Sequence, residues 1–421
     1  MMSRIIVAGG SPLRGELAVP GAKNAALPIL AAALLAQYPV RLYNCPRLSD
    51  VQNMIELLRS LGCTIAWEGD ALVIDPRDAQ CHEMPEHLSK ALRSSIFLLG
   101  PMVGKFRRAT ATFPGGCDIG VRPIDLHISA LNALGVRIEE SHGTLCCDGS
   151  TLTGARIHLD YPSVGATENA MMAAVSAEGD TVIQNAAREP EIIDLQAFLR
   201  KLGYSVSGAG SSDIFITGGC TPKPAEHRIM ADRIVAGTYL CGAAITGGDV
   251  TMRGIAPEYL GSVVSKLRES GCTIFAGGDY LRVVGPERPR ELKRVETMPY
   301  PGFPTDMQAQ IFALCTVADG ASMIVENVFE SRFKHASELV RMGADASVNG
   351  HIAVIRGVKR LTGANVEARD LRGGAALVLA GLRAEGETVV HGAEHIDRGY
   401  EAIERDLASL GATIRRLDEA L

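Results

Sequence analysis

The strongest constraint on the fold of this 421-residue chain is a pattern that the sequence repeats six times. In each copy a run with helical periodicity carries a leucine, reaches a glycine four residues later and continues into two strand-like runs. Such periods mark repeat architectures. A glycine directly after a helix fits the C′ position, where the backbone is left-handed. The six glycines lie 68 to 73 residues apart and are Gly62, Gly135, Gly203, Gly271, Gly343 and Gly411.

Between these glycines each repeat has the same order of elements. An alanine-rich apolar helix, such as residues 24–35 or 375–384, precedes a short strand such as 40–43 or 388–390. A polar loop, an amphipathic helix that ends at the glycine, and a hairpin follow. One repeat is therefore β-α-β-α-β-β, and six of them predict an α/β (α+β) fold.

The chain is too long for a single hydrophobic core, so we expect two domains of three repeats each. The sixth repeat stops after one hairpin strand, and residues 6–15 resemble residues 355–363 of the fifth repeat. We therefore expect the first twenty residues to complete the sixth repeat, with a crossover near residues 221–230. The predicted domain 1 spans 22–229, and domain 2 spans 1–21 and 230–421. One large mixed sheet is an alternative that the even spacing disfavours.

Composition excludes several classes of function. The net charge of −6 and the single tryptophan offer neither a basic field nor a stacking surface for nucleic acid. The longest apolar run, residues 25–36, contains Pro28 and is too short to span a bilayer. No signal peptide is recognisable before the ten scattered cysteines, which indicates reduced thiols and a cytoplasmic protein. Neither a GxGxxG turn nor a metal-ligand spacing is present, so we expect no cofactor and no metal.

Residues 114–123 (PGGCDIGVRP) combine three glycines with Cys117, Asp118 and Arg122. Such a glycine-rich run lets a ligand approach the backbone closely. It contains too little apolar surface for a core, and the nearby Arg122 favours the thiolate form of Cys117. The sequence predicts a loop that brings a thiol and a guanidinium onto a small anionic substrate. A cysteine that is only a small buried hydrophobe is the competing interpretation.

Charged residues recur at equivalent positions in the repeats. The starts of the first helices carry Lys23 with Asn24, Arg93, Ser163 to Gly165, Asp232 with Arg233, Thr305 with Asp306, and Arg372. The loops before the second helices carry Cys117 with Arg122, Arg188 with Glu189 and Glu191, Glu330 with Arg332, and Asp397 with Arg398. If equivalent ends of the repeats face each other, helix N-termini and arginines converge on one anion site. The carboxylate of Asp306 would then lie where a substrate hydroxyl could be deprotonated.

Each of these candidates has a structural alternative. Ser163, Asp232 and Thr305 fit helix N-caps, and for Asp232 we prefer that role. Arg188 and Glu189 fit an ordinary ion pair. Lys23 lies beside an apolar helix, where an unpaired charge is costly, so we expect it to bind a ligand.

Six motifs, spread from end to end, resemble the enolpyruvyl transferase family. They are residues 21–28 (GAKNAALP), 114–117 (PGGC), 122–127 (RPIDLH), 185–191 (NAAREPE), 303–310 (FPTDMQAQ) and 397–401 (DRGYE). The resemblance implies a two-domain inside-out α/β barrel of six βαβαββ repeats. It also implies transfer of enolpyruvate from phosphoenolpyruvate to the 3′-hydroxyl of UDP-N-acetylglucosamine, with release of phosphate. That reaction is the first committed step of peptidoglycan synthesis, and hence serves cell-wall growth, cell shape and division.

The resemblance also implies roles for individual residues. Asp306 would accept the hydroxyl proton, and Cys117 would donate a proton, form an adduct with phosphoenolpyruvate and react with fosfomycin. The residues implied for phosphoenolpyruvate are Lys23, Asn24, Arg122, Arg372 and Arg398, of which Lys23 and Arg398 count as catalytic. The residues implied for UDP-N-acetylglucosamine are Arg93, Arg122, Pro123, Ile124, Asp125, Leu126, Ser163, Val164, Gly165, Asp306, Val328 and Arg332.

One position departs from the family pattern. Two residues before Ser163 the family often has a lysine, whereas this chain has Tyr161, which cannot supply a charge to the nucleotide diphosphate. Two alternatives share the scaffold: the branch that acts on shikimate 3-phosphate, and a non-catalytic nucleotide-sugar sensor. The PGGC and RPIDL motifs disfavour the first, and the proton-accepting Asp306 disfavours the second. The oligomeric state stays open.

Overall fold

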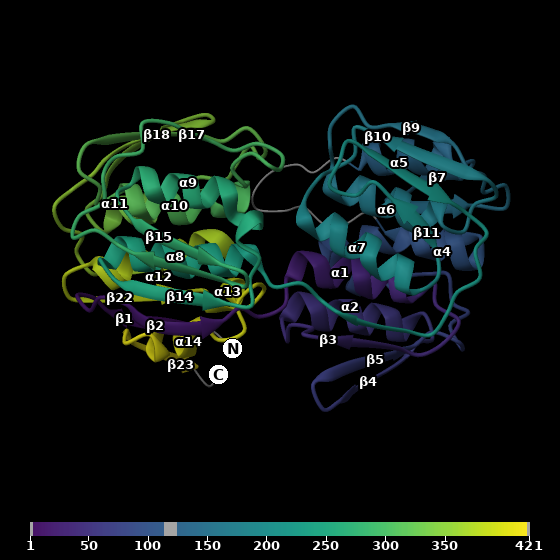
Figure 1. Ribbon diagram of the computed structural model, residues 1–421, viewed down its shortest axis with the longest axis horizontal. Helices are drawn as coiled ribbons and strands as arrows, with labels where there is room; N and C mark the ends of the chain where they lie inside the picture. The colour runs from purple at the N-terminus through teal and green to yellow at the C-terminus, as the bar shows by residue number, and fades with distance from the viewer. Residues whose placement is uncertain (1–2, 113–123, 419–421) are drawn as a thin grey trace. The chain divides into compact units, whose positions relative to one another are not determined.

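The computed structural model describes residues 3–112 and 124–418, and these form two compact units (Figure 1). Residues 21–112 and 124–230 belong to one of them, here called the insert unit. Residues 3–20 and 231–418 belong to the other, here called the terminal unit. Each unit has its own hydrophobic core.

The insert unit contains three of the repeats. Its elements are α1 (Lys23–Ala33), β3 (Val40–Tyr43), α2 (Ser49–Ser60), β4 (Thr64–Glu68), β5 (Ala71–Asp75), α3 (Glu86–Ala91), a 3-10 helix (Arg93–Leu98), α4 (Leu99–Phe106), β6 (Arg108–Thr112), α5 (Asp125–Ala133), β7 (Arg137–Ser141), β8 (Thr144–Asp148), β9 (Arg156–His158), α6 (Val164–Ala174), β10 (Asp180–Gln184), α7 (Pro190–Lys201), β11 (Ser205–Ser207), β12 (Asp213–Thr217) and β13 (Ala225–Arg228).

The terminal unit contains the other three repeats. Its elements are β1 (Ser3–Ala8), β2 (Arg14–Ala18), α8 (Arg233–Thr246), β14 (Asp249–Arg253), a 3-10 helix (Pro257–Leu260), α9 (Gly261–Glu269), β15 (Thr273–Gly277), β16 (Tyr280–Val284), β17 (Val295–Glu296), a 3-10 helix (Thr305–Met307), α10 (Gln308–Cys315), β18 (Ala321–Val325), α11 (Ala336–Arg341), β19 (Asp345–Asn349), β20 (Ile352–Arg356), β21 (Asn365–Glu367), α12 (Leu371–Arg383), β22 (Glu387–His391), α13 (Ala393–Ile396), α14 (Ile403–Ser409) and β23 (Thr413–Asp418).

The third repeat shows the pattern most completely. Strands β9 and β10 are parallel and joined by α6, so they form a crossover unit. Helix α7 then leads to the hairpin β11–β12, whose second strand pairs antiparallel with β10. The resulting sheet order is β11-β12-β10-β9. This is the predicted β-α-β-α-β-β arrangement, which is therefore confirmed.

The first helix of each repeat lies inside its unit. Helices α8 and α12 are buried along almost their whole lengths, and both are rich in alanine and glycine. A helix that is apolar all round belongs in a core, and small side chains let such helices approach one another. In Figure 1, α8, α10 and α12 run through the middle of the terminal unit, with strands outside them. The inside-out arrangement of helices within sheets is thus present in this unit.

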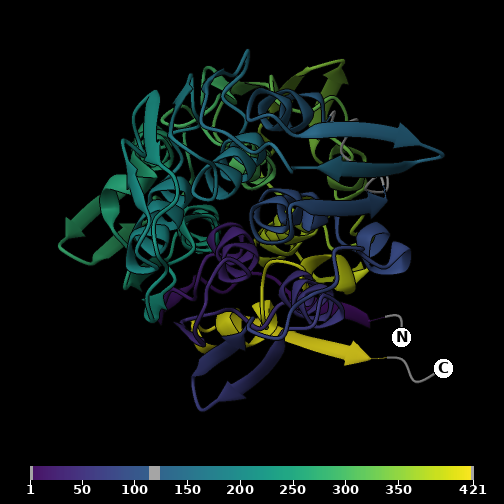
Figure 2. The same cartoon turned by 90° about the vertical axis from the view of Figure 1, so that its right-hand side faces the viewer.

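The N-terminal segment was predicted to complete the sixth repeat, and this is correct for β1 only. Strand β1 lies between β22 and β23 and pairs antiparallel with both (Figure 2). Strand β2 instead pairs in parallel with β14 and completes the sheet of the fourth repeat, so the prediction for residues 14–18 is wrong. In the insert unit β13 likewise pairs in parallel with β3 of the first repeat. The chain passes from one unit to the other directly after β2 and again directly after β13. Each of these strands is therefore far in sequence from the repeat whose sheet it completes.

All six repeat glycines have a positive φ, between 84° and 102°. At each of them the residue after the glycine donates its N–H to the carbonyl five residues earlier, and the glycine itself donates three residues back. One example is the pair of bonds from Cys63 to Leu58 and from Gly62 to Arg59. These two bonds define the Schellman motif. The prediction of six helix ends of one type is confirmed.

Candidate functional site

The carboxylate of Asp306 is held by two buried arginines of the terminal unit. Its Oδ1 accepts a hydrogen bond from Arg332 Nη2 at 2.7 Å, and its Oδ2 accepts one from Arg372 Nη2 at 3.0 Å. The arginine side chains are only 4% and 3% exposed, whereas that of Asp306 is 26% exposed. The structure thus brings together three residues that were predicted from their equivalent positions in the repeats. It leaves the Asp306 carboxylate accessible to solvent.

Different elements deliver these three side chains. Asp306 lies in the 3-10 turn before α10, Arg332 lies between β18 and α11, and Arg372 lies in the first turn of α12. That turn of α12 is capped by Asp370, whose Oδ1 accepts from the N–H groups of Arg372 and Gly373. The cap fixes the backbone from which the Arg372 side chain extends.

Behind Arg372 a polar chain runs into the core of the terminal unit. Arg372 Nη1 donates to the Tyr400 hydroxyl at 3.4 Å, and Tyr400 is 2.8 Å from Thr238 Oγ1. Thr238 also accepts from Gln310 Nε2 and donates to the carbonyl of Ile234. The Thr238 hydroxyl has one proton, and it donates that proton to the Ile234 carbonyl. The Tyr400 hydroxyl must therefore donate to Thr238 Oγ1, and its oxygen can accept from the Arg372 guanidinium. The chain orients Arg372.

The positive charge of Arg372 is stabilised although its side chain is buried. Burial, the largest single effect, would lower the pKa of Arg372, but the charges of Asp306, Tyr400 and Asp232 and the hydrogen bond to Asp306 together outweigh it, so the pKa is raised. Burial also raises the pKa of the Tyr400 hydroxyl, which keeps it neutral. The Nε atoms of Arg332 and Arg372 are buried and have no hydrogen-bond partner within the part of the chain that the structure describes.

In the insert unit the charge of Lys23 has an internal partner. Lys23, at the start of α1, places its Nζ 3.1 Å from Asp50 Oδ2 in the first turn of α2, and both side chains are largely buried. The expectation that Lys23 binds a ligand rested on the cost of an unpaired charge, and Asp50 removes that cost. The ion pair orients Lys23, and its ligand role stays a prediction. Asn24 follows it in α1.

The starts of α5 and α6 meet in the insert unit. Gly165 lies so close to the ring of His127 that a Cβ there would be 3.0 Å from its Cε1, and 2.9 Å from Phe97 Cε1. Only glycine allows this approach, which places residues 124–126 near residues 163–165. Burial lowers the pKa of His127 to about 4, so its ring is neutral and its Nδ1 lies 3.0 Å from Asn169 Nδ2.

The predicted caps can now be compared with the structure. Asp232 Oδ1 accepts from the N–H groups of Ile234 and Val235, so its role as the N-cap of α8 is confirmed. Ser163 also caps its helix, because its Oγ accepts from Ala166 at 3.4 Å. Thr305 makes no cap bond, and its hydroxyl donates to Glu326 instead.

The remaining predicted residues are placed as follows. Arg398 is half-buried just after α13, and its neighbour Asp397 forms an ion pair with Arg416. Val328 is half-buried in the segment after β18. Cys117, Arg122 and Pro123 lie outside the described residues, as does the side chain of Arg93.

Three buried carboxylates were missed by the sequence reasoning. Asp50 and Glu326 hold site segments in place, and Glu168 lies in α6 with no hydrogen-bond partner for either oxygen among the described residues. Burial, and then the charges of Glu191 and Glu189, raise the pKa of Glu168 well above its usual range. The run of Thr167, Glu168 and Asn169 inside an apolar helix was the signal that could have indicated it.

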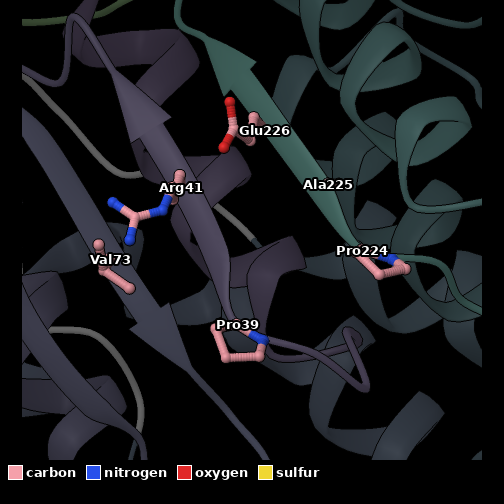
Figure 3. A pocket seen from close by; sticks show the side chains of 6 residues that line it. All are labelled: Pro39, Arg41, Val73, Pro224, Ala225 and Glu226. Carbon is pink, nitrogen blue, oxygen red and sulfur yellow. The ribbon is translucent and has the colours of Figure 1, made fainter.

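Within the described ranges no helix is long and apolar enough to cross a membrane, and no group of three or more His, Cys, Asp or Glu side chains could hold a metal ion. A hollow of about 210 Å³ lies against β3, β5 and β13, lined by Pro39, Arg41, Val73, Pro224, Ala225 and Glu226 (Figure 3). None of the predicted site residues that the structure describes lines it.

Comparison with known proteins gives full-length matches. The family model of EPSP synthase (3-phosphoshikimate 1-carboxyvinyltransferase) matches residues 7–407. A UDP-N-acetylglucosamine 1-carboxyvinyltransferase 2 of Caldanaerobacter subterraneus subsp. tengcongensis is 52% identical over 416 residues, covering 99% of this chain and 100% of the relative. A UDP-N-acetylglucosamine 1-carboxyvinyltransferase 1 of Symbiobacterium thermophilum is 51% identical over 420 residues, covering 98% and 95%.

Solved structures with the same fold are more distant in sequence. The enolpyruvyl transferase NikO from Streptomyces tendae has a TM-score of 0.89 at 24% identity, over 100% of both chains. EPSP synthase from Acinetobacter baumannii has a TM-score of 0.76 at 20% identity, over 99% of this chain and 100% of that one. These two matches establish the two-domain enolpyruvyl transferase fold.

Proposed function

Because this chain belongs to the enolpyruvyl transferase family, in its UDP-N-acetylglucosamine 1-carboxyvinyltransferase branch, we propose that it transfers enolpyruvate from phosphoenolpyruvate to the 3′-hydroxyl of UDP-N-acetylglucosamine. Phosphate is the second product. The observation that carries this proposal is the identity of 52% over 99% of the chain. The arrangement of Asp306 between two buried arginines supports it, because the reaction needs a proton acceptor beside sites for anions.

The chemistry is an addition followed by an elimination. Protonation of C3 of phosphoenolpyruvate leaves a cationic C2, and the sugar hydroxyl forms a new C–O bond there while its proton passes to Asp306. The tetrahedral product still carries the phosphate. It then loses a proton from C3 and the phosphate from C2, which restores the double bond. Overall one C–O bond to phosphate breaks, one C–O bond to the sugar forms, and no oxidation takes place.

Asp306 suits the role of proton acceptor for a geometric reason. Its two oxygens are oriented by Arg332 and Arg372, and its side chain is 26% exposed, so a substrate hydroxyl can approach the carboxylate. The polar chain from Arg372 through Tyr400 fixes the second arginine, so the carboxylate is held before substrate arrives. Such preorganisation lowers the barrier more than a freely rotating side chain would.

Phosphoenolpyruvate is assigned to Lys23, Asn24, Arg122, Arg372 and Arg398. Of these, Lys23 is oriented by Asp50, and Arg372 is oriented by Tyr400. The carboxylate and phosphate of the substrate are planar and tetrahedral anions that guanidinium groups bind through paired hydrogen bonds. We further assign to Cys117 the delivery of a proton to C3 and the formation of the adduct, and we expect fosfomycin to alkylate it.

The nucleotide sugar is assigned to Arg93, Arg122, Pro123, Ile124, Asp125, Leu126, Ser163, Val164, Gly165, Asp306, Val328 and Arg332. The close approach at Gly165 supports a shared surface for residues 124–126 and 163–165. The start of α6 also offers free N–H groups to a phosphate. Tyr161 is 44% exposed two residues before Ser163, so it can pack against the ligand but supplies no charge.

We further propose that the insert and terminal units are the two predicted domains, at 22–229 and at 1–21 with 230–421. The enzyme would act in the cytoplasm at the first committed step of peptidoglycan synthesis, and so would serve cell shape and division. Nine cysteines lie in the part of the chain that the structure describes and form no disulfide there, which agrees with a reducing compartment.

A coupled assay of phosphate release tests this function. We expect release only when phosphoenolpyruvate and UDP-N-acetylglucosamine are both present. Shikimate 3-phosphate, offered in place of the nucleotide sugar, should give no release, and activity with it would reassign the chain to the EPSP synthase branch. Nucleotide-sugar binding without turnover under any condition would favour the non-catalytic sensor.

A further inference from the structure

Glu326 is a fully buried carboxylate directly after β18, and four hydrogen-bond donors surround it. Its Oε1 accepts from the Thr297 hydroxyl at 2.8 Å and from the N–H groups of Val328 and Phe329 at 2.9 and 3.1 Å. Its Oε2 accepts from the Thr305 hydroxyl at 3.0 Å. One side chain therefore joins three segments that are distant in sequence.

No lysine, arginine or histidine in the described part of the chain forms an ion pair with Glu326. A buried carboxylate is costly unless hydrogen bonds compensate it, and here backbone and hydroxyl donors do so. The same contacts are extended by Asn327, which donates its N–H to Thr297 Oγ1 and its Nδ2 to the Thr297 carbonyl. The geometry of Glu326 thus fixes main-chain positions and does not neutralise a cation.

The segments that Glu326 joins are those that carry the site. Thr305 directly precedes Asp306, and Phe329 precedes Arg332 by three residues. Arg332 donates to Asp306 and its guanidinium lies 5.4 Å from the centre of the Phe329 ring. The contacts close a ring that runs from Glu326 through Thr305, Asp306, Arg332 and Phe329 back to Glu326.

We propose that Glu326 is a positioning residue for the reaction: it fixes the Asp306 carboxylate relative to the segment of residues 328–332. This inference rests on the proposed function, in which Asp306 accepts the hydroxyl proton and Val328 contacts the nucleotide sugar. Glu326 itself touches neither substrate. A displacement of about 1 Å between acceptor and hydroxyl lowers the rate by about 100-fold, so the length of this connection matters.

The test removes the Thr305 contact and spares the carboxylate. Thr305→Val keeps the shape of the side chain but loses the hydroxyl, and Thr305→Ser restores it. We expect kcat to fall about 10- to 100-fold in the valine variant and to return within about threefold of wild type in the serine variant. The KM for each substrate should change by less than about threefold, because the binding groups stay in place. Thr388→Val, at a buried hydroxyl of the same unit that has no hydrogen-bond partner among the described residues, is the matched control and should keep wild-type kcat.

A second pair of variants tests whether Glu326 and Thr305 act together. Glu326→Gln keeps an oxygen for the three Oε1 contacts but turns an amide N–H₂ toward Thr305, so the bond to Thr305 reverses or is lost. We expect a fall in kcat similar to that of Thr305→Val, and no further fall in the double variant. Thermal unfolding of every variant shows whether the fold is retained.

The outcomes separate the two proposals. If wild type releases no phosphate with its two substrates, the proposed function is wrong. If wild type is active and Thr305→Val is equally active, or if serine restores nothing, the positioning role is wrong although the function stands. Additive losses in the double variant would also contradict it.

Discussion

Lys23 and Asp50 form an ion pair in which Nζ and Oδ2 are 3.1 Å apart and the side chains are 12% and 4% exposed. The pair joins the start of α1 to the first turn of α2. It shows that a cation assigned to substrate is held in a fixed direction before substrate binds. The acidic partner therefore serves stability and orientation at the same time.

Replacing Asp50 by asparagine should destabilise the protein, because the buried ammonium loses this charge partner. We expect the free energy of unfolding to fall by about 2–3 kcal/mol, measured by urea unfolding. The double variant Lys23→Met with Asp50→Leu should recover most of that loss while remaining inactive. A single variant as stable as wild type would show that the ion pair contributes nothing.

Replacing Asp306 by asparagine should remove the proton acceptor without removing the binding surface. We expect phosphate release to fall by about 10²- to 10⁴-fold. Calorimetry should show that UDP-N-acetylglucosamine still binds within about tenfold of its wild-type affinity. Near-normal turnover in this variant would exclude Asp306 from the acceptor role.

The cysteines should react in a fixed order with an alkylating agent. Burial raises the pKa of Cys63 to about 11 and those of Cys147 and Cys315 to about 12, so these thiols should stay unmodified in the folded protein. Among the described cysteines only Cys81 and Cys146 are exposed. Mass spectrometry after limited treatment should show Cys117 modified first, by fosfomycin in particular when the sugar nucleotide is present. Prior modification of a buried thiol would contradict the burial argument.

Replacing Glu168 by glutamine should stabilise the protein, and more so at higher pH. Burial raises the pKa of Glu168, so the folded state holds a proton that the unfolded state releases above its ordinary value of 4.5. This contribution lowers stability as the pH rises above 4.5. The rise in melting temperature on substitution should therefore be larger at pH 8 than at pH 5. An equal rise at both values would mean that no proton is involved.

Two buried histidines should have the opposite effect on how stability changes with pH. Burial lowers the pKa of His127 and of His335 to about 4, so the unfolded state binds protons that the folded state does not. Stability should fall as the pH drops from about 6.5 towards 4, by up to about 3 kcal/mol for each ring. Both wild type and Glu168→Gln should show this acid loss.

Replacing Gly411 by alanine should cost stability through backbone strain alone. Its φ is 93°, and a Cβ would meet nothing within 4 Å. We expect the free energy of unfolding to fall by about 1 kcal/mol. Gly261→Ala is the control, because that glycine also has open space but no positive φ, and it should be neutral or stabilising by up to about 0.5 kcal/mol. Equal effects at the two positions would contradict the role of φ.

The repeat architecture could be predicted because its signals are local. A glycine at C′, an alanine-rich helix and an alternating hairpin each occupy a few consecutive residues. The pairing of β2 with β14 could not, because residues 14–18 look the same whichever sheet receives them. Strand pairing depends on contacts across more than two hundred residues, and the passage of the chain between units leaves no pattern in the strand itself.

The candidate site likewise contains residues that could be predicted from the repeat pattern and residues that could not. Asp306, Arg332 and Arg372 were predicted because each has an equivalent position in the repeat. Asp50 and Glu326 were not recognised. Their partners Lys23 and Thr297 lie 27 and 29 residues away, and a carboxylate that will be buried has no periodic signature of its own. Such residues can be identified only once the fold is known.

The place of β1 between β22 and β23 has a consequence for synthesis. The strand leaves the ribosome long before its two neighbours, which begin at Glu387 and end at Asp418. At about 5–20 residues per second it waits roughly 20–75 s with both edges unpaired. During that interval the insert unit can fold, because all of its residues are synthesised before residue 231, whereas the terminal unit cannot close. The N-terminal strand is therefore the part of the nascent chain most in need of protection from other exposed edges.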